Sequence, residues 1–371
     1  MNFLITFSLL VLIVYGITIV SFALGWFKLN YFCRTIQPEK EPVSIVISCR
    51  NEEENLPHLF QSLLNQDYPK ENIEIIVVDD HSEDNTYKIL NQYAKKNKRL
   101  KILQNPTNQQ GKKAALAYGI QHSTSEIIVN TDADCRMDKK WLSALVAYYT
   151  IHKPKMLIAP VAIEYSSKIF AQLQALEFTS LVLSGAGAAG INKPIMCNGA
   201  NLLFEKSLFN KNALYTDYAS GDDIFLLLQA KKENSRDIHF IKSRDAIVYT
   251  NPNQTLSGFF NQRIRWTSKS KAYSDFDIII TALTVAASNF LLAFWLIYSI
   301  FHPNQWDFFI LLFAIKSLAD LLILIPGTRF FHQQTLLWLF LPLQIIYPFY
   351  IVATTFFGWL ANFSWKGRKL R

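Results

Sequence analysis

The stretch Ile-Glu-Ile-Ile-Val-Val-Asp-Asp, residues 73–80, joins an apolar, β-branched run to two adjacent aspartates. Such a run, ending abruptly in polar residues, is typical of a buried strand that leads into a loop. Three similar runs occur at 43–48, 100–103 and 127–130. Helical patterns accompany them at 52–66, 85–95, 112–121 and 139–151. This alternation predicts an α/β domain built on a mainly parallel, doubly wound sheet.

Charged residues are scarce on both sides of this domain. The chain has 371 residues, with 37 Lys or Arg and 29 Asp or Glu, but residues 1–27 contain none of them and residues 278–364 contain four. Apolar runs long enough to cross a bilayer lie at 3–25, 278–300, 307–326 and 336–362. The distribution excludes a fully soluble enzyme and a disordered chain.

Three parts are therefore predicted. They are an N-terminal transmembrane anchor (1–27), a water-soluble domain (28–277) and a C-terminal membrane domain with about three spans (278–371). Within the soluble domain, 168–183 indicates a helix close to the membrane. The Gly/Ala-rich stretch 184–190 indicates a loop, and 197–201 is predicted to form a loop and strand.

Basic residues predict the orientation in the membrane. Lys28 and Arg34 follow the first span, and the cluster 263–271 precedes the second. Because basic residues concentrate on the inner side, we expect a multi-pass protein of the cell inner membrane with a cytoplasmic soluble domain. This accounts for the net charge of +8 without a nucleic-acid partner. Four spans put the C-terminus outside, but the basic tail 366–371 favours the inside, so its side is left open.

Two ionisable residues lie inside the predicted span 307–326. Lys316 and Asp320 are four residues apart and therefore share one helix face. Charges inside a membrane often mark functional sites. We favour a mutually neutralising structural pair.

Two acidic clusters follow predicted strands. Asp79-Asp80 follows the strand at 73–78, and Asp132-Ala133-Asp134 follows the strand at 127–130. Ligands of such sheets bind at the carboxyl ends of the strands, so both clusters are expected at the ligand-binding edge. Carboxylates two residues apart suit a hard divalent cation that also binds a diphosphate. Oxygen ligands do not by themselves choose between Mg²⁺ and Mn²⁺.

A larger series of motifs contains these clusters. In order they are Arg50-Asn51-Glu52, Asp79-Asp80, Gly111-Lys112, Asp132-Ala133-Asp134, Gly199-Ala200-Asn201, Gly221-Asp222-Asp223 and Gln262-Arg263-Ile264-Arg265-Trp266. The series covers about residues 40–270 and resembles the family 2 glycosyltransferases. The last motif, just before a membrane span, resembles the membrane-bound branch with its polysaccharide synthases and ceramide glucosyltransferases. The resemblance implies a GT-A fold and inverting transfer from a nucleotide-sugar.

The resemblance also implies the binding residues. The nucleotide-sugar would be bound by Arg50, Glu52, Asp79, Asp80, Lys112, Asp132, Gln262, Arg265 and Trp266. Lys112 opens a helix near the phosphates, and Lys113 is its solvated neighbour. Asp134 would be the metal ligand, with Asp132 reaching the nucleotide-sugar or the metal, and the metal would be Mg²⁺ or Mn²⁺. The alternative for Glu52 is a favourable acid in the first turn of a helix.

Asp223, with Asp222, is implied as the catalytic pair. Asp223 would take a proton from the acceptor hydroxyl as it attacks the anomeric carbon. Capping of the following helix is the alternative. Gln262, Arg265 and Trp266 share one face of an interfacial helix at 256–270. Trp266 would stack on the acceptor, although an ordinary interfacial helix has the same pattern.

The predicted function is therefore a divalent-metal-dependent membrane glycosyltransferase. It moves a sugar, most simply from a UDP-sugar, to a hydroxyl of a lipid, lipid-linked or polysaccharide acceptor. Few spans favour a lipid acceptor over a self-contained polymer channel. Two alternatives are a polyprenyl-phosphate sugar transferase and a non-enzymatic transporter or scaffold that binds nucleotides. The Gln262–Trp266 motif argues against the first, and Lys316 with Asp320 is the only support for a transporter.

Overall fold

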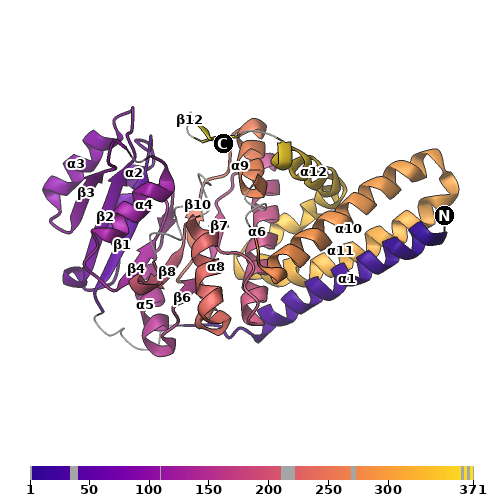
Figure 1. Cartoon of the computed structure of the whole chain (residues 1–371), viewed down its shortest axis with the longest axis horizontal. Helices are drawn as coiled ribbons and strands as arrows, with labels where there is room; N and C mark the ends of the chain where they lie inside the picture. The colour runs from indigo at the N-terminus through magenta and orange to yellow at the C-terminus, as the bar shows by residue number, and fades with distance from the viewer. Residues whose placement is uncertain are drawn as a thin grey trace. The chain divides into compact units, whose positions relative to one another are not determined.

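The computed structural model describes residues 2–33, 41–108, 110–209, 222–268, 273–360, 363–365 and 368–370. The chain forms two compact units (Figure 1). The helical unit comprises residues 1–28, 165–195 and 252–363, and the sheet unit comprises residues 29–164, 196–251 and 364–371.

The sheet unit is built on a seven-stranded sheet in the order β3-β2-β1-β4-β8-β6-β9. Its strands are β1 (Val43–Cys49), β2 (Ile73–Asp79), β3 (Leu100–Gln104), β4 (Ile127–Asn130), β6 (Met156–Ile158), β8 (Leu202–Glu205) and β9 (Ile238–Phe240). A three-stranded sheet contains β5 (Arg136–Met137), β10 (Val248–Thr250) and β7 (Val161–Ile163). The α/β fold is confirmed, with one difference: β8 runs antiparallel to both of its neighbours.

Helices follow the predicted strands at the expected places. They are α2 (Leu56–Leu64), α3 (Thr86–Lys96), α4 (Lys112–Gln121), α5 (Trp141–His152) and, later in the chain, α8 (Asp222–Asn234). Figure 1 shows α2, α3 and α4 around strands β1 to β3. Helix α4 packs closely on the sheet because Gly119 has no side chain. A Cβ there would lie 2.6 Å from Val46 Cγ1 and 3.0 Å from Val78 Cγ2.

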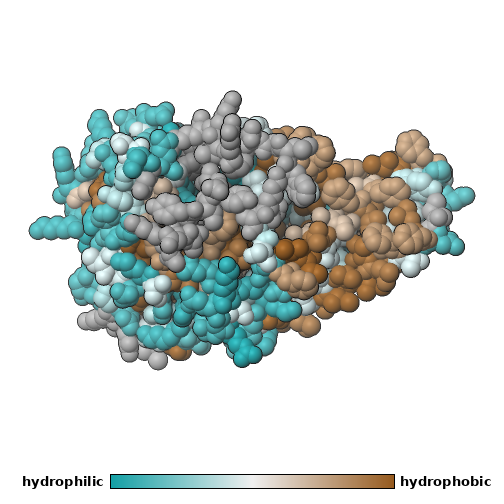
Figure 2. Space-filling view, viewed as in Figure 1, coloured by the Kyte–Doolittle hydropathy of each residue, from teal (hydrophilic) through white to brown (hydrophobic). Residues whose placement is uncertain are grey.

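The helical unit contains long apolar helices. They are α1 (Asn2–Lys28), α6 (Ile169–Gly190), α10 (Phe276–Phe301), α11 (Trp306–Phe330) and α12 (Phe340–Leu360), with the shorter α9 (Leu256–Ser268). Five stretches of the described chain are long and apolar enough to cross a membrane, and one of them is α6. In Figure 2 a mostly brown, apolar surface covers the visible face of α1, α10 and α11.

Helix α6 corrects one prediction. The stretch 184–190 is not a loop but the last two turns of this helix. Its glycines permit close packing, since a Cβ on Gly187 would lie 2.0 Å from the carbonyl oxygen of Phe22 in α1. Strand β6, before α6 in the sequence, pairs with β8, after it, within one sheet. A simple crossing would put parts of that sheet on opposite sides of a membrane, so α6 does not act as a simple span.

Helices α6 and α9 thus belong to the helical unit, although the sequence assigned both to the soluble segment 28–277. The domain limits at 27 and 277 stay a prediction. The pair of Lys316 and Asp320 forms as expected, with 2.7 Å between Nζ and Oδ2. Gln344 from α12 and Tyr15 from α1 complete its hydrogen bonds. Because the charges are buried and paired, a structural role accounts for them.

Candidate functional site

The strand register brings three of the motifs to one edge of the sheet unit. Strand β1 is parallel to β2, with Cys49 opposite Asp79, and parallel to β4, with Val46 opposite Asn130. The loops that follow these strands therefore emerge at the same carboxyl edge. They carry Arg50, Asp79-Asp80 and Asp132-Ala133-Asp134.

Asp80 is completely buried and organises this edge. Its carboxylate accepts hydrogen bonds from Asn105 Nδ2 at 2.8 Å and from the Gly111 backbone N–H at 3.0 Å. Gly111 has φ = +99°, a conformation that favours glycine, and it precedes α4 directly. Asp80 thus fixes the start of α4 and the place of Lys112.

Lys112 lies beside the first aspartate of the Asp-x-Asp turn. Its Nζ is 2.6 Å from Asp132 Oδ1, and both side chains are partly exposed. Lys113 is not the solvated neighbour that the sequence predicted. It is buried, and its Nζ lies 4.9 Å from the centroid of the Phe225 ring in α8. A cation–π contact explains how this lysine is accommodated inside the protein.

The Asp-x-Asp turn concentrates negative charge. Asp134 Oδ2 accepts a hydrogen bond from Thr250 Oγ1 at 3.2 Å. Burial raises the pKa of the adjacent Cys135 thiol well above its usual range, and the charges of Asp134 and Asp132 raise that pKa further. Within the described ranges, no group of three or more His, Cys, Asp or Glu side chains could hold a metal ion. The two carboxylates fit an ion that takes its other ligands from phosphate or water.

Asp223 connects to the same edge through the backbone. Its Oδ2 accepts a hydrogen bond from the Gly199 N–H at 3.2 Å, and Oδ1 accepts one from the Ile224 N–H at 2.8 Å. Asn130 at the end of β4 donates from Nδ2 to the Gly199 carbonyl at 2.7 Å. Gly199 therefore connects Asp223, near the start of α8, to Asn130, at the end of β4. Gly221 and the side chain of Asp222 lie outside the described parts of the structure.

Among the described residues, three buried carboxylate or amide oxygens at this edge have no hydrogen-bond partner. They are Asp79 Oδ1, Asn105 Oδ1 and Asn130 Oδ1, at the ends of β2, β3 and β4. A buried acceptor without a donor costs about 1–3 kcal/mol. The two asparagines were not predicted as site residues, although each directly follows the core of a strand. Their amide nitrogens are engaged by Asp80 and Gly199, so the oxygens are available to a ligand that donates hydrogen bonds.

Arg50 binds the loop after β2 and Glu52 binds Asn55 in its own loop, and the binding of the nucleotide-sugar by these two residues stays a prediction. The buried Arg50 guanidinium donates to the carbonyls of Asp80 (2.9 Å) and His81 and to the Glu83 carboxylate (2.7 Å). Glu52 Oε2 accepts a hydrogen bond from Asn55 Nδ2 at 2.7 Å. Arg50 therefore fixes the loop after β2, and with it Asp80.

Replacing Arg50 by Ala is expected to lower the free energy of unfolding by about 3 kcal/mol, because the buried carbonyls that it binds lose their donor. Thermal unfolding of the purified protein measures the change. Glu83→Gln is the matched control, since the Glu83 side chain is 78% exposed and its pairing contributes little. Equal stability of the Ala variant and the parent would contradict this role.

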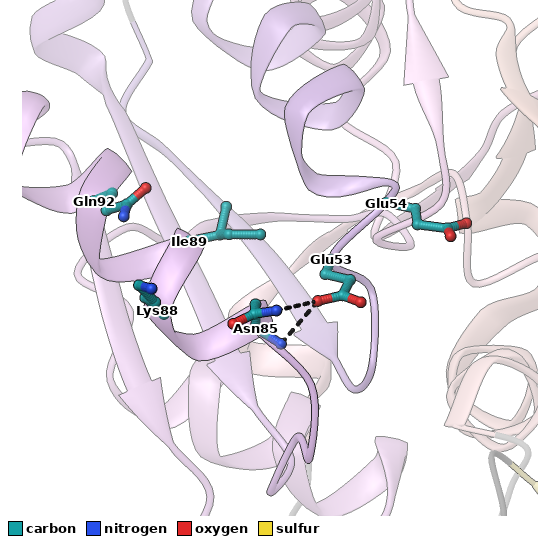
Figure 3. A pocket seen from close by; sticks show the side chains of 6 residues that line it. All are labelled: Glu53, Glu54, Asn85, Lys88, Ile89 and Gln92. Carbon is teal, nitrogen blue, oxygen red and sulfur yellow. Dashed lines mark hydrogen bonds between the residues drawn. The ribbon is translucent and has the colours of Figure 1, made fainter.

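A separate hollow of about 440 Å³ lies beside α3 and contains none of the predicted site residues. It is lined by Glu53, Glu54, Asn85, Lys88, Ile89 and Gln92. Figure 3 shows the Glu53 carboxylate bound by both the backbone and the side chain of Asn85. These hydrogen bonds between two loops account for the position of the Glu53 carboxylate, so no ligand is needed to explain it.

The Gln262–Trp266 motif lies in α9 of the helical unit, as a helix was predicted there. Gln262 Oε1 accepts a hydrogen bond from Asn253 Nδ2 at 3.0 Å. The Trp266 ring centroid lies 6.4 Å from that of Phe178 in α6. Participation of Gln262, Arg265 and Trp266 in the site stays a prediction.

Two family models match the chain. The model described as glycosyl transferase family 2 matches residues 44–209. The model described as glycosyl transferase family group 2 matches residues 127–365, more than half of the chain.

Two curated proteins illustrate the similarity. A poly-beta-1,6-N-acetyl-D-glucosamine synthase of Staphylococcus epidermidis is 27% identical over 264 residues, which cover 68% of this chain and 60% of that protein. The probable glycosyltransferase YdaM of Bacillus subtilis is 26% identical over 240 residues, covering 62% of this chain and 55% of that protein. The match thus spans less than two thirds of either relative.

A solved structure has a similar fold. It is the mannosyltransferase PcManGT of Pyrobaculum calidifontis, in complex with GDP-Man and Mn²⁺. The TM-score is 0.58 at 18% identity, and the match covers 96% of this chain and 99% of that chain. This likeness confirms the GT-A fold.

Proposed function

We propose that this chain, which belongs to the family 2 glycosyltransferases, binds a nucleotide-sugar at the carboxyl edge of its sheet and transfers the sugar with inversion to a hydroxyl acceptor. The observation that carries the proposal is the set of three unpartnered buried acceptor oxygens beside Lys112 and the Asp-x-Asp turn. A nucleoside offers donors for them in its base and ribose hydroxyls. Its diphosphate offers oxygens for a cation.

Each side chain then has a task. Asp79, with the buried amides of Asn105 and Asn130, binds the nucleoside. When the donor binds, the Lys112 ammonium turns partly from Asp132 to the diphosphate. The dipole at the N-terminus of α4 also favours the negative charge of the diphosphate. Asp132 and Asp134 would hold Mg²⁺ or Mn²⁺, which supplies charge neutralisation of the departing diphosphate.

Asp223 is the proposed general base. It accepts the proton of the acceptor hydroxyl at a carboxylate oxygen as that hydroxyl attacks the anomeric carbon. The Gly199 N–H holds one oxygen of the carboxylate, so the side chain is oriented before the reaction. Trp266 of α9 stacks on the acceptor, and Gln262 and Arg265 contact the diphosphate.

The donor class is proposed as a UDP-sugar. UDP-N-acetylglucosamine is the first to test because one relative is a poly-beta-1,6-N-acetyl-D-glucosamine synthase. The acceptor is proposed as a lipid, lipid-linked or glycan hydroxyl. The proposed location is the cell inner membrane, with the sheet unit in the cytoplasm, and the apolar helices and basic flanks support it. Membership of the family sets aside the non-enzymatic scaffold.

The test is transfer from radiolabelled UDP- and GDP-sugars by membranes that contain the protein, followed by mass spectrometry of the product. We expect label from one of these donors in a chloroform-soluble or polymeric product. Absence of transfer from every donor by a folded, nucleotide-binding protein would contradict the proposal.

Asp79→Asn tests the nucleoside contact. We expect the KM for the donor to rise about 10- to 100-fold, because an acceptor oxygen is replaced by an N–H₂ donor. Stability should not fall, since Asn keeps an acceptor for the Ser82 N–H and removes a buried charge. Steady-state kinetics and thermal unfolding measure the two effects. Asp245→Asn, at a partly exposed position with a weak pair 4.0 Å from Lys140, is the control.

A further inference from the structure

Arg263 lies inside the Gln262–Trp266 motif, but the sequence assigned it no role. The residue is only 4% exposed. Its Nη2 donates to Glu177 Oε2 in α6, and the side chain of Glu177 is also 4% exposed. The two residues therefore form a buried ion pair that joins α9 to α6.

The same guanidinium packs between two aromatic rings of its own helix. Its Cζ lies 4.8 Å from the centroid of the Phe259 ring and 4.1 Å from that of Trp266. Phe259, Arg263 and Trp266 are spaced i, i+4 and i+7 and so share one helix face. The Trp266 ring also meets Phe178, the neighbour of Glu177 in α6.

We propose that Arg263 is a positioning residue for sugar transfer: Glu177 fixes the guanidinium, and the guanidinium fixes the ring of Trp266. A guanidinium donates hydrogen bonds in its plane while its faces stack on rings, which an ammonium group does not do. The inference rests on the proposed role of Trp266 at the acceptor. It adds two residues, Glu177 in α6 and Arg263 in α9.

A different result is expected if the ion pair only stabilises the fold. Removing one partner of a buried pair destabilises a protein by about 3–5 kcal/mol, whereas replacing both by apolar residues of similar size is often neutral or stabilising. The double variant Glu177→Leu/Arg263→Met therefore separates stability from positioning. If the pair only stabilises the fold, the double variant restores function. If Arg263 positions Trp266, it does not.

Fluorine NMR reports the position of Trp266 directly. The protein has eight tryptophans, and in full-length protein labelled with fluorotryptophan the Trp266→Phe variant identifies the Trp266 signal. In the double variant we expect near-parental thermal stability, a shifted or broadened Trp266 signal and unchanged signals elsewhere. Transfer to the endogenous acceptor should fall about 10- to 100-fold, with hydrolysis of UDP-N-acetylglucosamine by water unchanged.

Arg263→Lys is the second variant, since it retains the charge and removes the planar group. We expect the same displaced signal and the same selective loss of transfer. An unchanged Trp266 signal together with parental transfer in either folded variant would overturn the inference. Parental transfer in Trp266→Phe itself would contradict the proposed acceptor role of Trp266, and the fluorine signal would still decide whether Arg263 positions the ring.

Discussion

Asp223→Asn is expected to lower the turnover number for sugar transfer about 10²- to 10⁴-fold, because it removes the proposed general base for the acceptor hydroxyl. Asn still offers one oxygen to the Gly199 N–H or the Ile224 N–H, so the start of α8 should keep its conformation. The affinity for the nucleotide-sugar should change less than threefold, since the proposed role of Asp223 is on the acceptor.

Single-turnover kinetics and calorimetric titration with UDP-N-acetylglucosamine measure these two quantities separately. Asp245→Asn again provides an Asp-to-Asn change outside the site. A fall in donor affinity with an unchanged turnover number would assign Asp223 to binding. If folded Asp223→Asn kept more than half of the parental turnover number, Asp223 would not be the general base.

Removal of divalent cations is the second large effect. We expect EDTA to lower transfer at least about 10²-fold, and Mg²⁺ or Mn²⁺ to restore it, because the leaving diphosphate would otherwise depart without charge neutralisation. Asp134→Asn should raise the concentration of Mn²⁺ needed for half-maximal activity by at least about tenfold. Its bond from Thr250 Oγ1 survives in Asn, so the fold should persist.

Metal titrations of the parent, Asp134→Asn and Asp245→Asn test this directly. Thr250→Val is an informative companion, since it removes the hydroxyl that binds Asp134 without removing a carboxylate. Full activity of the parent after exhaustive EDTA treatment would contradict metal dependence. An unchanged metal requirement in Asp134→Asn would mean that a residue other than Asp134 binds the metal.

The sheet was predictable because each strand carries its own signal. A short β-branched run ending in Asp or Asn defines β2 and β4 almost to the residue. The antiparallel direction of β8 was not predictable, since it depends on the return of the chain after α6. The stretch 184–190 was wrongly predicted to be a loop because its three glycines disfavour a helix in water. In α6 they permit close packing against α1.

The site was predictable where motif and strand end coincide, as at Asp79 and Asp132. The hydrogen bonds of the Arg50 guanidinium to the loop after β2 were not predictable, because they depend on the tertiary structure. Lys112 and Lys113 are adjacent in sequence, and only the location of Phe225 decides that Lys113 is the buried one. Nothing in the sequence marks Asn105 and Asn130 as site residues except their places at the ends of β3 and β4.

One nucleotide-sugar is proposed to contact Asp79, the Asp-x-Asp turn and Asp223 together. The most direct test of this proposal is a cryo-electron microscopy structure of the full-length protein with Mn²⁺ and UDP-N-acetylglucosamine. We predict uridine at Asp79, the diphosphate and metal at Asp134, and the anomeric carbon facing Asp223. Nucleotide bound instead in the hollow between Glu53 and Lys88, or away from all three aspartates, would contradict the account.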